Sequence, residues 1–189
     1  MSTRIMTGKV RLSYVNIFEP KSINGSDPKY SVALLIPKTD TDTIAKVEAA
    51  IEEALQAGIG KFGGKMPPRG ALKLPLRDGD TERDAEEYAG HYFINANSKT
   101  RPGVVDQNVQ PIIDPEEIYS GCYARATVTF FAYSASGNRG VGAGLGNIQK
   151  LADGERLAGG PSAESDFGAV EFAKADPAPF DGGGDSFLD

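Results

Sequence analysis

The stretch GCYARATVTFFAYS, residues 121–134, decides the fold of this 189-residue chain. Because side chains alternate between the two faces of a strand, one face here is small and apolar, as a core requires. The opposite face carries aromatic rings, hydroxyls and an arginine. We expect a long strand with Cys122, Ala124, Ala126, Val128, Phe130 and Ala132 in the core and Tyr123, Arg125, Thr127, Thr129, Phe131 and Tyr133 outside.

Other parts of the chain supply further strands and one helix. The strand-like runs are residues 9–18, 29–37, 91–98 and 139–151, with a shorter apolar piece at 71–76. Residues 40–57 instead repeat apolar side chains at helical spacing and stop at Gly58, which predicts an amphipathic helix. Because strands and helices do not alternate as a parallel sheet requires, we predict a mostly β fold with one main helix, an OB-fold-like Greek-key barrel.

The charge of the chain divides it into a body and a tail. Residues 1–150 hold 18 Lys and Arg against 17 Asp and Glu, whereas residues 151–189 hold 2 against 9. From residue 152 the composition is mainly Gly, Ala, Pro, Ser and Asp with isolated phenylalanines, which is typical of disorder. We therefore expect one OB-like domain at 1–151 and a flexible acidic tail at 152–189.

The composition argues against several functions. No apolar run approaches the roughly 20 residues that span a bilayer, and the start lacks the core of a signal peptide, so we expect a cytoplasmic protein without membrane contact. One cysteine, Cys122, and one histidine, His91, cannot form a standard zinc site. The acidic run at 78–87 lacks the spacing of a calcium loop, and no nucleotide-binding glycine motif is matched. We expect no catalytic residue, metal or cofactor.

The outer face of residues 121–134 suits a flexible polyanion, because rings stack on bases while cations and hydroxyls hold the backbone. Candidate nucleic-acid contacts on it are Tyr123, Arg125, Phe131 and Tyr133. Basic residues in loops beside glycine, proline or aromatics add Lys61, Lys65, Lys99, Arg101 and Arg139. Each ring alone is better explained by packing and each basic cluster alone by an ordinary solvated surface, so only their combination indicates nucleic acid.

The segment NRGVGAGLGN, residues 138–147, has glycine at every second position from Gly140 to Gly146. As a strand it has an apolar face and a face of bare backbone. Two interpretations remain open. Either a large group lies against the bare backbone, or glycine lets the strand bend as the barrel closes.

Several segments, in order along the chain, resemble the phage single-stranded DNA-binding proteins, a family once described only as of unknown function. They are KVRLSYVNIFEP, KYSVALLIPK, RDGD, GHYFINANS with RPGVVD, and above all YSGCYARATVTFFAYSASGNRGVGAGLGNIQKLADGE. The likeness spans roughly residues 5–158. It implies an OB-like barrel that coats single-stranded DNA, without sequence preference, in phage replication or recombination.

The resemblance also implies a role for the end of the chain, APFDGGGDSFLD. Such proteins commonly finish in an acidic tail with a terminal aromatic, which engages phage or host replication proteins and competes with DNA for the basic groove. The corresponding contacts here are Phe180, Phe187, Leu188 and Asp189. This tail departs from the usual form because Asp189 follows the last aromatic.

Two alternatives come from other classes of protein. A β-rich phage structural or protein-interaction component would use the same aromatic face to bind protein, and salt-dependent retention on single-stranded DNA separates this reading from DNA binding. A metal-dependent enzyme acting on nucleic acid would need a cluster of carboxylates in a recognisable pattern, which the sequence lacks.

Overall fold

The computed structural model describes residues 3–22, 25 and 27–157 of the protein. The described residues belong to the first of two compact units, which spans Met1–Leu157. The four tail residues expected to contact partners, Phe180, Phe187, Leu188 and Asp189, lie outside the described residues.

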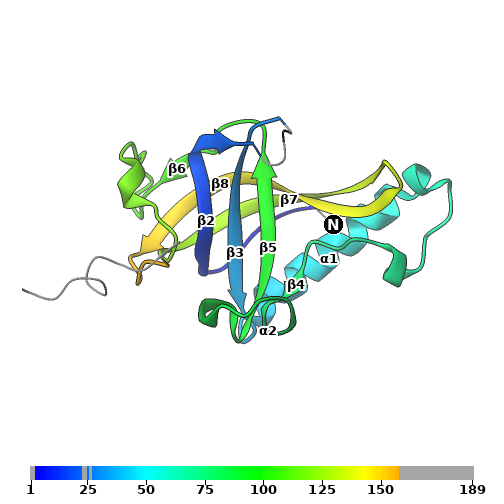
Figure 1. The fold of residues 1–189 in the computed structure, drawn as a ribbon, viewed down its shortest axis with the longest axis horizontal. Coiled ribbons are helices and arrows are strands. Elements are labelled where there is room, and N and C mark those ends of the chain that lie inside the picture. The colour runs from blue at the N-terminus through cyan, green and yellow to red at the C-terminus, as the bar shows by residue number, and fades with distance from the viewer. Residues whose placement is uncertain (1–2, 23–24, 26, 158–189) are drawn as a thin grey trace, which may run out of the picture. The chain divides into compact units, whose positions relative to one another are not determined.

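Strands are the main secondary structure of the described residues, and one long helix accompanies them (Figure 1). The strands are β1 (Arg4–Met6), β2 (Val10–Lys21), β3 (Lys29–Pro37), β4 (Arg77–Asp78), β5 (His91–Ser98), β6 (Val104–Val105), β7 (Tyr123–Ala135) and β8 (Asn138–Ala152). The helices are α1 (Thr41–Ala57), the short α2 (Gly79–Glu82) and the 3-10 turns η1 (Ile59–Phe62), η2 (Arg69–Ala71), η3 (Glu86–Tyr88) and η4 (Pro115–Glu117).

The predicted long strands and the helix are all present, whereas the shorter apolar piece at 71–76 does not form a strand. That segment makes only an isolated bridge between Lys73 and Gly140. Pro75 interrupts the run, and proline has no N–H to donate to a ladder. The short strands β1 and β6 were not predicted, because two or three residues show no periodicity.

Five of the strands close into a barrel. Antiparallel pairs join β2 to β3, β3 to β5, β7 to β8, and β7 to β2. Parallel pairing of β5 with β8, at Asn97 and Gly144, completes the ring. Figure 1 shows β2, β3 and β5 side by side, with β7 and β8 crossing behind them and continuing outward as a hairpin. We call the outer part of the hairpin, residues 131–142, the arm. The closed five-stranded ring confirms the OB-type prediction.

The inner face of β7 is buried as predicted, since none of its six expected core residues is more than 4% exposed. The helix α1 packs against β7 with its apolar face, which includes Val47 and Leu55. It begins after Asp40, whose carboxylate accepts the backbone N–H of Thr43. It ends at Gly58, where an added Cβ would come within 2.2 Å of the Cβ of Ala132. Only glycine therefore lets the helix end this close to β7.

The acidic segment at 78–87 is tied to the barrel through Lys38. The Nζ of Lys38 donates to Asp78 at 2.8 Å and to Asp80 at 2.7 Å. These hydrogen bonds lower the pKa of both carboxyls and raise the pKa of Lys38. Directly after the segment, Tyr88 is buried edge-on against Phe93, on the outer face of β5, and so brings the segment onto this face. The segment therefore covers part of this outer face.

The domain continues past the boundary expected after residue 151. Beyond β8 the chain folds back on the barrel: the hydroxyl of Tyr119 donates to the carboxylate of Asp153 at 2.9 Å, and the N–H of Leu157 donates to the carbonyl of Ser120 at 2.8 Å. Residues 152–157 thus belong to the first unit. Their composition resembles that of the tail, so nothing in the local sequence indicates that they are attached to the barrel.

The described ranges contain neither a membrane-spanning helix nor a group of metal-binding side chains. None of their helices is long and apolar enough to cross a bilayer. No three His, Cys, Asp or Glu side chains of the same residues are grouped as a metal site requires. Cys122 is buried as a free thiol, and burial raises its pKa.

Candidate nucleic-acid interface

One register row crosses the outer surface of six strands. Its members pair in turn, from Arg4 to Thr129, Gly144, Asn97, Ser31 and Asn16. All six are exposed or half-buried, whereas strand neighbours such as Val128, Ala96 and Val32 lie in the core. The row is therefore a strip of small or polar residues that runs across the strands from β1 to β2. We call it the polar strip.

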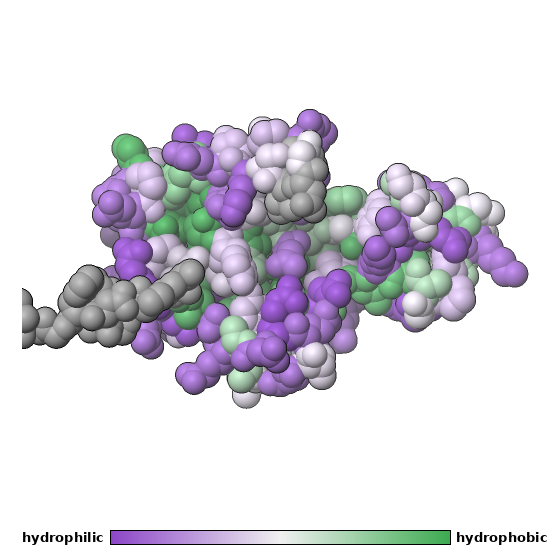
Figure 2. Space-filling view, in the orientation of Figure 1, coloured by the Kyte–Doolittle hydropathy of each residue, from purple (hydrophilic) through white to green (hydrophobic). Residues whose placement is uncertain are grey.

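The β2–β3–β5 end of the polar strip is hollowed into a groove of about 330 Å³, lined by Asn16, Ser31, Asn97, Tyr14 and Lys21 among others. A β-bulge between Ser13 and Asn16 places Tyr14 at φ 49 and leaves it 67% exposed. Figure 2 views the molecule onto these strands and shows hydrophilic side chains over β5 and around α2. An exposed ring beside small polar side chains can stack on a base of a nucleic acid while the nucleic-acid backbone remains hydrated.

Basic residues cluster at one end of this groove. Lys21, at the end of β2, pairs with Lys29 at the start of β3. Lys99 and Arg101 follow the last residue of β5, which is paired with β3 at that end. The guanidinium of Arg101 lies 5.4 Å from the ring centre of Phe18 on β2. The predicted contacts Lys99 and Arg101 thus follow β5 at the end of the sheet where the groove residue Lys21 lies.

Toward its other end, the polar strip is flanked by Phe131. An added Cβ on Gly142 would come within 2.6 Å of the Cζ of Phe131, and one on Gly144 within 3.7 Å of its ring. The ring therefore lies across the bare backbone of β8. It is 47% exposed, beside Thr129 of the strip on the outer face of β7. The predicted contact Phe131 is in a position to stack on a base.

The remaining glycines of β8 are also covered by the chain itself. The backbone of Lys73 lies against Gly140, where an added Cβ would be 2.0 Å from its carbonyl oxygen. The side chain of Thr127 lies against Gly146. The sequence left open whether a large group lies against these glycines or whether they let the strand bend. Groups do lie against them, and they belong to the protein itself: Phe131, Lys73 and Thr127.

Tyr123 is covered by cations of the same chain. The Nζ of Lys9 lies 4.9 Å and the Cζ of Arg11 5.6 Å from its ring centre. Arg11 is anchored there, because its Nε donates to the carbonyl of Gly121 at 3.1 Å. The half-buried ring of Tyr123 thus has charged neighbours that the sequence alone did not reveal.

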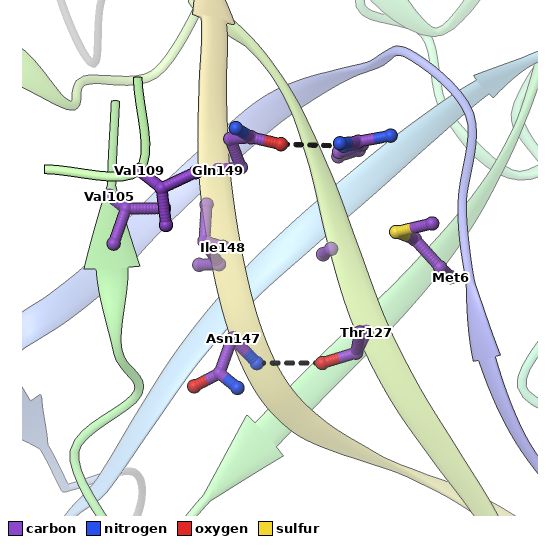
Figure 3. Close-up of a pocket in the computed structure, with 9 residues that line it drawn as sticks. Met6, Val105, Val109, Thr127, Asn147, Ile148 and Gln149 are labelled. Carbon is purple, nitrogen blue, oxygen red and sulfur yellow. Dashed lines mark hydrogen bonds between the residues drawn. The ribbon is translucent and has the colours of Figure 1, made fainter. Parts of the chain in front are cut away.

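Arg125 lies at a separate cavity of about 190 Å³ on the outer side of β7 and β8 (Figure 3). Its Nε donates to the Oε1 of Gln149 at 2.6 Å. The cavity is otherwise mainly apolar, with Met6, Val105 and Val109 among its lining residues. We call it the Met6 cavity.

The other predicted contacts belong to the arm or to the loop beside it. Tyr133 and Arg139 lie on its two strands, and Tyr133 is half-buried. The Nζ of Lys61 in η1 donates to the carbonyl of Ala132 at 2.9 Å, which ties the loop to the arm. Lys65 is exposed in the same loop. The nine predicted residues therefore lie at four places: along the strip, at Tyr123, at Arg125 and at the arm.

The sequence argument missed the groove, whose polar and aromatic lining residues are Tyr14, Asn16, Lys21, Ser31, Asn95 and Asn97. Asn, Ser and Lys are common surface residues, so each of them singly carried no signal. The stretch SYVN, residues 13–16, has the polar and aromatic alternation of the outer face predicted for 121–134, and this is the signal that could have located Tyr14.

Comparison with known proteins identifies the family. Residues 3–177 match the family described as Enterobacter phage Enc34, ssDNA-binding protein. Protein p50 of Acyrthosiphon pisum secondary endosymbiont phage 1 is 35% identical over 166 residues, which cover 83% of this chain and 88% of that protein.

Two solved structures share the fold. The single-stranded DNA-binding protein from bacteriophage Enc34 in complex with ssDNA superposes with a TM-score of 0.72 at 28% identity, covering 82% of this chain and 90% of that one. For gp2.5, a single-stranded DNA-binding protein encoded by bacteriophage T7, the TM-score is 0.61 at 16% identity, over 85% of this chain and 98% of that one; this second likeness concerns the fold alone. On its sequence match, the chain belongs to the family of the Enterobacter phage Enc34 ssDNA-binding protein.

Proposed function

We propose that the protein binds single-stranded DNA without sequence preference and coats it during phage replication or recombination, in the cytoplasm of the host cell. The observation that carries the proposal is the polar strip with its groove, which runs across the barrel between two exposed rings, Tyr14 and Phe131. Family membership and the likeness to a structure solved with ssDNA support it.

The strip suits a single strand for physical reasons. Exposed rings stack on any base, which makes binding tolerant of sequence. Small side chains such as Ser31, Asn97 and Gly144 let the strand approach the sheet closely. The cations at the groove, Lys21, Lys29, Lys99 and Arg101, offset phosphate charge and make binding depend on salt. In this arrangement Phe131, Lys99 and Arg101 contact DNA along the strip. Tyr123 and Arg125 do not line the groove and meet DNA only where the bound strand continues beyond it.

The arm supplies further cations. Arg139 is exposed near its tip, and Lys61 and Lys65 are exposed beside it. A flexible strand that leaves the polar strip past Phe131 meets this arm next, where Tyr133 lies on the same face of β7 as Phe131. We assign these four residues to a second, weaker contact.

The acidic tail is proposed to recruit replication proteins and to compete with DNA. Residues 158–189 carry seven Asp and Glu against one Lys. A tether of that charge reaches a high local concentration near a basic groove even when each contact is weak. Phe180 and Phe187, together with Leu188 and Asp189, are the proposed anchors for phage or host replication proteins.

A titration of labelled oligothymidylate at several salt concentrations tests DNA binding. Asn97→Glu places a negative charge on the strip and should weaken binding at least tenfold, whereas Thr41→Glu, at the exposed start of α1, should not change it. Lys99→Gln and Arg101→Gln should each reduce the salt slope by about 0.7, the value per contact for single strands. The matched control is Lys46→Gln on α1.

The outcomes distinguish the candidate functions. If folded Asn97→Glu protein binds like the wild type, the strip is not the binding path. If the wild type itself is not retained on single-stranded DNA at low salt, DNA binding is wrong. The alternative, a phage structural or protein-interaction component, would then stand.

A further inference from the structure

The Met6 cavity lies one step along the strands from the polar strip. Met6 is two residues from Arg4 on β1, and Thr127 is two residues from Thr129 on β7. Residues two apart on a strand share a face, and Met6 pairs with Thr127, so the pair forms the next row of the same outer surface. A strand of DNA that reaches the β1 end of the strip therefore arrives at this cavity.

The cavity has an apolar wall that is unusually exposed. Met6 is 45% and Val109 66% exposed. Val109 adopts φ 60, a left-handed conformation that is rare for a β-branched residue. Such outliers persist only when the surrounding structure determines them.

Hydrogen bonds hold this wall in place. The Oδ1 of Asp106 accepts the backbone N–H groups of Asn108 and Gln110, which closes the turn that carries Val109. The Nε2 of Gln149 donates to the carbonyl of Asp106 at 3.2 Å and so joins the turn to β8. The wall is therefore built before any ligand arrives.

The rim of the cavity is polar and positively charged. Gln149 accepts the Nε of Arg125 and so orients its guanidinium at the rim. Asn147, whose backbone N–H donates to the hydroxyl of Thr127, lies on the other side of the opening (Figure 3). Among the described residues that line the cavity, Arg125 is the one charged side chain.

We propose that the Met6 cavity receives one unstacked base of bound single-stranded DNA, with the adjoining phosphate at Arg125; this rests on the proposed function. At about 190 Å³ the cavity is smaller than the roughly 300–1,000 Å³ of a drug-sized ligand site and suits a single flat ring system. Apolar walls accept the faces of a base of any sequence, and an arginine plane stacks on them as well. The base in the cavity no longer stacks on its neighbours. Each bound protein molecule would therefore hold one nucleotide of the coated strand at a fixed position.

Photo-crosslinking of the full chain to oligothymidylate containing 5-iodo-deoxyuridine tests the assignment. A base in the cavity should crosslink to Met6, within the tryptic peptide of residues 5–9 that is bounded by Arg4 and Lys9. Val109→Asn should abolish this crosslink and raise the Kd about fivefold, because it removes one apolar contact with the base. Asparagine tolerates positive φ, so this variant should fold at least as well. The matched control is Ile113→Asn, since Ile113 is 82% exposed and is not one of the cavity residues.

The results separate this proposal from the proposed function. If crosslinks form only at the groove residues and Val109→Asn binds like Ile113→Asn, the base pocket is wrong while DNA binding stands. The rate at which an added oxidant converts Met6 to its sulfoxide reports whether the cavity is covered. If deletion of residues 158–189 changes this rate and addition of DNA does not, the cavity binds a segment of protein, and the proposal is also overturned. If the wild type is not retained on DNA, the failure lies in the proposed function.

Discussion

The ring of Phe131 lies against the backbone of Gly142, close enough that an added Cβ would sit 2.6 Å from its Cζ. The pair comes from the two strands of one hairpin, where Phe131 and Gly142 are direct register partners. A bare position on β8 therefore fixes where the ring is presented. This relationship leads to the first prediction.

Gly142→Ala should displace the Phe131 ring and weaken binding of single-stranded DNA. Losing one aromatic stack costs about 1–3 kcal/mol of binding free energy. The fold should survive, because the obstructing atom is the far end of a side chain. In a Phe131→Ala background the same change should have no further effect on DNA affinity, which a double-mutant cycle measures. Additive losses would show that the two residues act independently. Gly70→Ala, whose Cβ would face open space away from the strip, is the matched control.

Gly140→Ala should destabilise the protein itself. Its Cβ would come within 2.0 Å of the carbonyl oxygen of Lys73, and that oxygen accepts the N–H of Val141 at 2.9 Å. Backbone atoms on both sides leave little room to adjust, so we expect a loss of about 1–3 kcal/mol in the free energy of unfolding. Urea denaturation measures it. Gly60→Ala, which faces open space, should stay within about 0.5 kcal/mol of the wild type. Equal stability of the two variants would contradict the tight contact.

Deletion of residues 158–189 should tighten DNA binding, most strongly at low salt, because it removes seven acids and one lysine. A full-length chain with those acids changed to Asn or Gln should behave like the deletion, which separates charge from length. Titration at low and moderate salt measures both. Identical affinity of all three proteins would rule out competition by the tail, while capture of replication proteins would still have to be measured directly.

Lys38→Met should lower stability at neutral pH and have less effect in acid. The hydrogen bonds from Lys38 lower the pKa of Asp78 and Asp80 from their ordinary value of 3.8. A depressed carboxyl pKa stabilises the fold above the unfolded value, and this contribution is lost as pH falls through the folded pKa. Denaturation at neutral pH and at about pH 3 should therefore show the difference between variant and wild type shrinking. Lys46→Met on α1 should show no such change, and a constant difference for Lys38→Met would argue against the ion pairs.

Local patterns were enough to predict the elements of the barrel. Because one side of β7 is buried, its sequence alternates between apolar side chains and polar or aromatic ones. The six residues that this alternation places inside are all buried. The helix could be predicted in the same way from its spacing and from Gly58. The OB-type closure followed from the number and order of these elements, since few arrangements of such strands around one helix avoid open edges.

The site depended on contacts between distant segments. Thr129, Gly144, Asn97, Ser31 and Asn16 are ordinary residues in sequence, and they form a strip only because four strand pairings bring them into one row. Arg11 on β2 and Lys9, just before β2, lie over the ring of Tyr123 because β2 pairs with β7 at this point.

By itself, then, the sequence determined the five long strands, the main helix and the buried face of residues 121–134. It also predicted a basic, aromatic surface and an acidic tail. These properties come from local periodicity and composition, which need no knowledge of neighbours. Only the tertiary structure decided which outer residues stand together, that Phe131 rests on Gly142, and that Arg125 opens onto a cavity beside Met6. Such relationships depend on strand register, and register is set by the packing of the whole barrel rather than by any one strand.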